Sequence, residues 1–67
     1  MRLQRFFIVQ SLESYDFLCS DDSGDVGFTP VLSRAGCYES REDAVEAGIE
    51  EIGAGFAIFE FLRYLED

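Results

Sequence analysis

The sequence predicts a single small α+β domain over residues 1–67, with a three-stranded antiparallel sheet and one helix packed on one sheet face. Two observations predict this β-β-α-β order. Alternating apolar runs near both ends of the chain are typical of strands, and the charged segment Ser40–Gly53 is the only strong helix signal. The length adds a limit, because a domain near 60 residues buries only about 60% of its unfolded surface. Such a chain has little room for an enclosed active site.

The first strand is predicted over Arg2–Gln10, where apolar side chains fall on both faces of an extended chain and indicate a central strand. Polar residues 11–14 form a hairpin connection to an antiparallel second strand over Tyr15–Cys19. The third strand is predicted over Phe56–Leu65, where dense aromatic residues favour strand over helix. One helix covers only one face of this sheet. We therefore expect the second face to be covered by segment 27–38 or to be used in a dimer.

The helix is predicted to begin at Ser40, whose hydroxyl can cap the first turn, with Asp43 three residues further on. It is predicted to end at Gly53 in the left-handed conformation. Gly48 costs about 1 kcal/mol relative to alanine in a helix, which indicates close approach to the sheet together with Ala44. The apolar stripe toward the sheet is predicted to be Val45, Ile49 and Ile52.

Residues 20–27 have the composition of a loop, and residues 31–38 are predicted to be a short helical turn or an irregular crossing over one end of the core. Asp21, Ser23 and Asp25 are spaced like the first ligands of a calcium loop. The pattern then fails, because Val26 replaces the required glycine and Leu32 the required glutamate. A solvated acidic turn is the favoured interpretation, and no metal or other cofactor is expected.

The composition argues against catalysis and for binding. The chain has 14 acidic residues, 5 arginines, no histidine and a net charge of −9. Neither Cys19 nor Cys37 has a histidine to lower the pKa of its thiol, and no paired carboxylates indicate acid–base chemistry. We expect no enzymatic activity. The charge repels nucleic acid and anionic membranes and attracts basic partners, although net charge also serves solubility alone.

Arginines interrupt the N-terminal apolar run, so the sequence carries no signal-peptide pattern, and no apolar run approaches the roughly 20 residues of a membrane span. We therefore expect a cytoplasmic protein with two free thiols, although a single disulfide stays open.

The acidic side of the predicted helix is the most informative feature. Its five carboxylates recur about every 3 Å over about 14 Å, against one charge per about 1.7 Å of duplex DNA. They belong to Glu42, Asp43, Glu46, Glu50 and Glu51. A surface of this kind can occupy a basic groove that normally holds nucleic acid. The candidate partner-binding residues are Glu42, Asp43, Glu46 and Glu50 on the helix, Asp21, Asp22 and Asp25 in the loop, and Glu13 and Asp16 as weaker candidates.

The stretch Gly24–Gly48 resembles small proteins that are common in bacteriophages and prophages. The matching steps are Gly27-Phe28-Thr29, then Ala35, Gly36 and Tyr38, then Ser40, Glu42, Asp43 and Ala44. In length, acidity and predicted element order the chain is also similar to small anti-CRISPR proteins that inhibit type I surveillance complexes. This resemblance implies an inhibitor carried by a mobile element, acting in the host cytoplasm on a basic, DNA-binding subunit.

The leading hypothesis is therefore a non-enzymatic inhibitor, monomeric or weakly dimeric, whose acidic surface binds a basic nucleic-acid-binding host protein. The alternative is an assembly module in which Tyr15, Phe59 and Phe61 join the protein to itself or to a partner, while the acids only maintain solubility.

Overall fold

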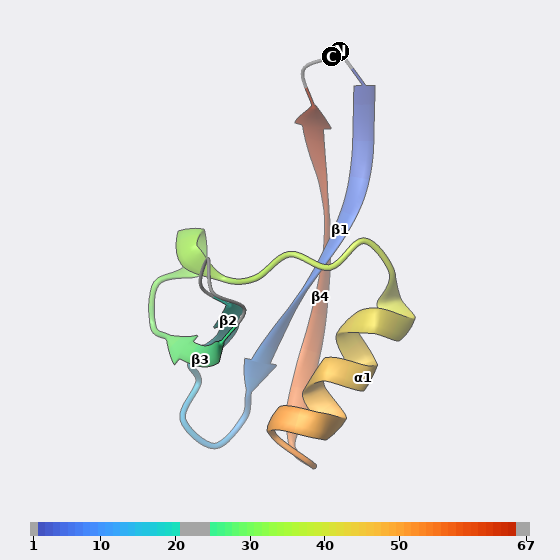
Figure 1. Ribbon diagram of the computed structural model, residues 1–67. Coiled ribbons are helices and arrows are strands. Elements are labelled where there is room, and N and C mark those ends of the chain that lie inside the picture. The colour runs from blue at the N-terminus through green and yellow to red at the C-terminus, as the bar shows by residue number, and fades with distance from the viewer. Residues whose placement is uncertain (1, 21–24, 66–67) are drawn as a thin grey trace.

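The chain folds into an antiparallel sheet with one helix on one face (Figure 1). This computed structural model describes residues 2–20 and 25–65. The elements are β1 (Arg2–Ser11), β2 (Phe17–Ser20), β3 (Val26–Thr29), the 3₁₀ turn η1 (Leu32–Arg34), α1 (Arg41–Glu51) and β4 (Phe56–Leu65). The sheet has four strands in the order β3-β2-β1-β4. The predicted α+β class and the central position of β1 are confirmed.

The prediction of three strands is wrong, because Val26–Thr29 forms β3 and pairs along the whole of β2. This strand is only four residues long and contains Gly27, and it follows an acidic segment with the composition of a turn. Four residues are too few for an alternating apolar pattern to be recognised next to a segment rich in turn-forming residues.

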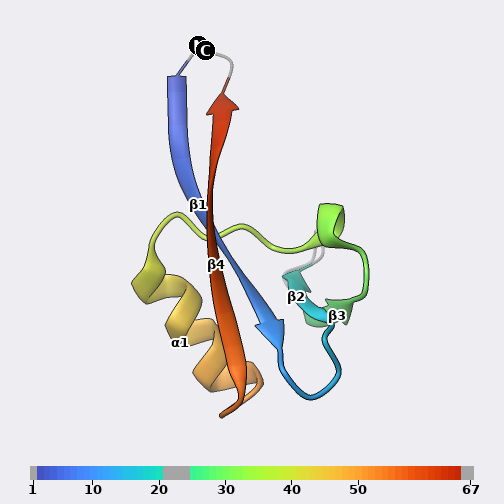
Figure 2. The ribbon, with the colours of Figure 1, turned by 180° about the vertical axis from the view of Figure 1, so that it is seen from behind.

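The strands β1 and β4 form a long ribbon that carries the rest of the fold. They pair in one unbroken register from Arg2↔Leu65 to Ser11↔Phe56. The short β2–β3 hairpin joins β1 only at the end of β1, through Gln10↔Phe17. Seen from both sides, the tip of the ribbon that carries the two chain ends extends beyond the helix and the hairpin (Figures 1 and 2).

The second strand starts two residues later than predicted, at Phe17, because the connection from β1 is longer. The Ser11 N–H donates to the Asp16 carbonyl, and the Tyr15 N–H donates back to the Ser11 carbonyl, both at 2.9 Å. Tyr15 lies in this turn with φ 63°, the left-handed region that non-glycine residues rarely adopt. Its side chain therefore belongs to a turn and not to a strand face.

The helix is capped as the sequence predicts. The Ser40 hydroxyl accepts the Asp43 N–H at 3.1 Å, and Gly53 follows the last turn with φ 94°. The predicted inward stripe is only partly right: Ile52 packs against the core, whereas Ile49 is 57% exposed. Ala44 and Gly48 are the buried helix residues, which confirms the close approach predicted for them. Small residues face the sheet because the helix lies close to it: a Cβ on Gly48 would meet the Phe56 ring at 2.6 Å.

The main core lies between the helix and the sheet. Its buried members are Phe7, Val9, Leu18 and Ala44. The chain reaches the helix by crossing the edge of β1, where Tyr38 and Phe7 exchange two backbone hydrogen bonds of 2.8 Å. The preceding Gly36 donates its N–H to the Leu18 carbonyl at 2.9 Å. Residues 32–38 thus pass from one face of the sheet to the other.

Candidate functional site

The outward side of α1 presents a mixed acidic and apolar surface. Glu42, Glu46 and Glu50 follow one another at successive turns, with Val45 and Ile49 beside them. These residues and Arg41 line a shallow depression on the helix. Below, the "α1 outer face" means this set of residues.

The packing of the helix explains why this face is exposed. Because Ala44 and Gly48 must face the sheet, the glutamates on the opposite side of the helix point to solvent, and all three are exposed. Among the described residues, none of them forms an ion pair. Asp43 is also exposed, near the positive end of the helix. The four helix residues predicted from the sequence therefore lie together on one rigid element.

A second acidic group lies at the β1–β2 turn. Glu13 is exposed and Asp16 half-buried, and both line a shallow depression with Glu51 from the end of α1. The candidate site residues did not include Glu51, although its place in the last helical turn was the available signal. Asp25 is exposed just before β3, whereas Asp21 and Asp22 lie outside the described residues. The structure therefore has one acidic group along the outside of α1 and a second at the end of the same helix, beside the β1–β2 turn.

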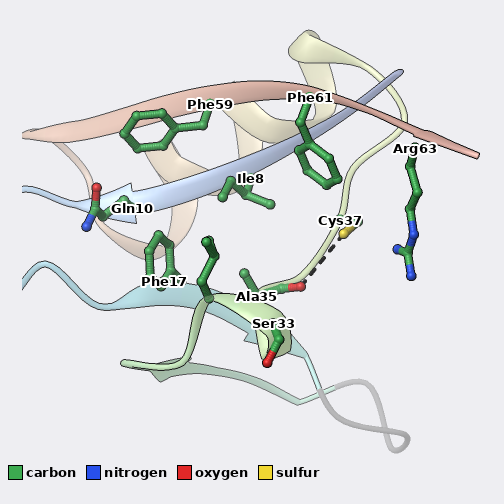
Figure 3. Close-up of a pocket in the computed structure, with 10 residues that line it drawn as sticks. Ile8, Gln10, Phe17, Ser33, Ala35, Cys37, Phe59, Phe61 and Arg63 are labelled. Atoms are coloured by element: carbon green, nitrogen blue, oxygen red, sulfur yellow. Dashed lines mark hydrogen bonds between the residues drawn. The ribbon is translucent and has the colours of Figure 1, made fainter. Parts of the chain in front are cut away.

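The sheet face opposite α1 carries an apolar groove with a volume of about 580 Å³ (Figure 3). Phe59 and Phe61 from β4, Ile8 from β1 and Phe17 from β2 line it, and residues 32–37 close one side. The expected partial cover of the second face by segment 27–38 is thus confirmed. Phe59 remains 47% exposed. Tyr15 is not part of the lining, so the three aromatics of the assembly hypothesis do not form one patch.

One cation borders this groove. The Arg63 guanidinium lies 5.9 Å from the centre of the Phe6 ring, and the Phe6 and Phe61 ring centres are 6.0 Å apart. Arg63 lines the groove, whereas Arg5 pairs with Glu60 at 2.6 Å. The sequence placed apolar residues and segment 27–38 on this face, but gave no sign that Arg63 borders it.

Three further side chains with titratable groups are Cys19, Cys37 and Tyr38. Cys19 is half-buried and Cys37 exposed, and both thiols are free. Burial raises the pKa of Tyr38 above its usual 10.0, with further contributions from the negative charges of Glu51 and Cys19. Residues 2–20 and 25–65 contain no group of three or more side chains arranged to hold a metal ion. Within the same residues, no helix has the length and apolarity needed to cross a membrane.

Comparison of the chain with protein-family models, with curated protein sequences and with solved structures finds no match.

Proposed function

We propose that the chain is a non-enzymatic inhibitor of the phage type, whose α1 outer face binds a basic nucleic-acid-binding protein and blocks its nucleic-acid site. The observation that carries this proposal is the row of three exposed glutamates on one helix. Caps at both ends hold the helix backbone in place, so little backbone entropy is lost when the row binds.

The electrostatics of the row support competition with nucleic acid. Glu42 and Glu50 are eight residues apart, which is about 12 Å along a helix axis. A lysine- and arginine-rich groove that tracks phosphates at about 1.7 Å per charge can meet carboxylates on this scale. The net charge of −9 attracts such a groove from a distance and raises the rate of encounter.

The apolar residues of the same face add contact energy that a purely charged surface lacks. Ile49 is 57% exposed beside the row of glutamates and can be buried in an interface. Burying a side chain of this size fully contributes about 1.5–3 kcal/mol. The interface would then combine an apolar strip with an acidic one along the same helix. The anti-CRISPR resemblance makes a DNA-binding subunit of a type I surveillance complex the first partner to test.

Paired charge reversals test the proposal. Glu46→Lys with Glu50→Lys reverses the α1 outer face, and Glu13→Lys with Asp16→Lys makes the same change in net charge at the β1–β2 turn. Immobilised wild-type chain should capture a basic nucleic-acid-binding protein at low salt and lose it within the salt range where exposed charges are screened. The helix variant should capture none, while the turn variant should retain most of it. Equal capture by all three proteins would contradict the assignment.

A second candidate function is supported by the apolar groove, whose exposed Phe59 could bind an apolar segment of a partner. Binding through this groove should hold or strengthen with sulfate salts, because such salts strengthen apolar burial. Phe59→Ser should then abolish capture, while the helix reversals should leave it intact. The two functions therefore predict opposite salt responses and different sensitive variants.

A further inference from the structure

We infer that the outer edge of β4 is a self-association site, at which two copies of the chain pair antiparallel and form one continuous sheet. This inference is independent of the α1 outer face. It starts from the position of β4 at the end of the strand order, where one side of the strand has no neighbour in the sheet.

The hydrogen-bond pattern identifies the backbone groups at that edge. Phe7 exchanges both of its backbone bonds with Tyr38, so its N–H and C=O point away from β4. Its partner across the ribbon is Glu60, which must therefore direct its own N–H and C=O to the outer side. Alternation along the strand gives the other residues that do the same: Phe56, Ile58, Leu62 and Tyr64. None of these groups bonds to another described backbone group outside the strand.

The edge lacks several of the features that normally prevent strand pairing, although Glu60 and Arg63 place two charges on it. β4 is ten residues long, contains no proline, and pairs with β1 throughout without a bulge. Its exposed apolar side chains are Phe59, Leu62 and Tyr64. By contrast, the opposite edge strand β3 has only four residues.

Charge at this edge permits a second copy in some registers and opposes it in others. The β1–β4 ribbon holds three of the chain's five arginines and one glutamate, so the repulsion expected from the net charge is concentrated elsewhere. A two-fold axis at Glu60 would oppose two glutamates, and an axis at Arg63 would oppose two arginines. An axis at Phe61 avoids both. It places Glu60 opposite the partner's Leu62 and Arg63 opposite the partner's Phe59.

The register with Phe61 on the axis also uses the edge well. Two kinds of residue pair become hydrogen-bonded in this register: Glu60 with the partner's Leu62, and Ile58 with the partner's Tyr64. Each pair occurs twice about the two-fold axis and exchanges two backbone bonds, which gives about eight new hydrogen bonds. The Phe61 residues become a non-hydrogen-bonded pair, whose Cα atoms lie about 4.5 Å apart. Apolar surface next to each groove is then covered by the other copy.

Leu62 provides a charge test of both the edge and the register. Its side chain is 58% exposed and lies opposite Arg5 on β1, so the monomer should tolerate a glutamate there and a lysine at a small cost. Leu62→Glu would oppose the partner's Glu60 twice and should weaken dimerisation by about 2- to 30-fold, while Leu62→Lys should strengthen it by a similar factor. Sedimentation equilibrium from micromolar to millimolar concentration measures both, with circular dichroism confirming the fold.

Crosslinking tests the axis directly. In a background with Cys19→Ser and Cys37→Ser, Phe61→Cys should form a covalent dimer on oxidation, because a separation of about 4.5 Å suits a disulfide. Tyr64→Cys in the same background is the control and should not crosslink to itself. A wild-type chain that stays monomeric at millimolar concentration would overturn the inference. The Phe61 register would be refuted if Leu62→Glu and Leu62→Lys changed association equally.

Discussion

Replacing Gly48 by alanine should destabilise the protein, although alanine is the better helix former. In an open helix this change stabilises by about 1 kcal/mol. Here the added Cβ would lie 2.6, 2.7 and 2.8 Å from three atoms of the Phe56 ring, closer than real Cβ contacts. Overpacking of this kind costs about 1–3 kcal/mol. The net effect should therefore be a loss of up to about 2 kcal/mol.

A double-mutant cycle with Phe56→Leu separates the two effects of the alanine. Leucine removes the ring atoms that the Cβ would meet, so Gly48→Ala should become neutral or stabilising in that background. Urea unfolding followed by circular dichroism gives the four free energies of unfolding. The proposed contact would be refuted if Gly48→Ala stabilised the wild-type protein by the full helix-propensity gain of about 1 kcal/mol.

Two further predictions concern single tyrosines. Burial and nearby negative charge raise the pKa of Tyr38 above 10.0 in the folded state. The stability that the neutral tyrosine supports is therefore present below about pH 10 and is lost as the pH rises through the folded-state pKa. Urea unfolding between about pH 8 and about pH 11 should show a smaller alkaline loss in Tyr38→Phe than in wild type, and equal losses would contradict the assignment. Tyr15 has φ 63° and is 66% exposed. Its left-handed conformation costs about 1–2 kcal/mol, which Tyr15→Gly should relieve. After subtraction of the entropy cost of glycine, the substitution should stabilise the protein by up to about 1 kcal/mol. A loss of stability in urea unfolding would show that the Tyr15 side chain contributes packing.

The parts of the fold that the sequence predicted well have strong local signals. The strands β1 and β4 are long apolar runs, and α1 has a serine cap and a terminal glycine that act within a few residues. The strand β3 was missed because Val26–Thr29 is short and depends on pairing with β2, which no local pattern encodes. The inward helix stripe was predicted only in part, because periodicity favours large apolar residues. Ile52 packs against the core, but Ile49 is exposed and the small residues Ala44 and Gly48 are the buried ones.

The candidate site was predicted in part for the same reason. Helical spacing is enough to place Glu42, Glu46 and Glu50 on one face, and the structure keeps them exposed together. The contribution of Ile49 to that face could not be predicted, since it depends on how closely α1 approaches the sheet. The groove beside Phe59 likewise depends on residues 32–37 crossing the edge of β1, which is a tertiary contact.

Displacement of nucleic acid from the captured partner tests the proposed inhibition most directly. A labelled duplex bound to that partner should lose fluorescence anisotropy when wild-type chain is added. The variant with Glu46→Lys and Glu50→Lys should leave the duplex bound, while the variant with Glu13→Lys and Asp16→Lys should displace most of it. Competition predicts that the chain and the duplex never occupy the partner together. A stable ternary complex, or displacement that the helix reversals do not change, would contradict the account.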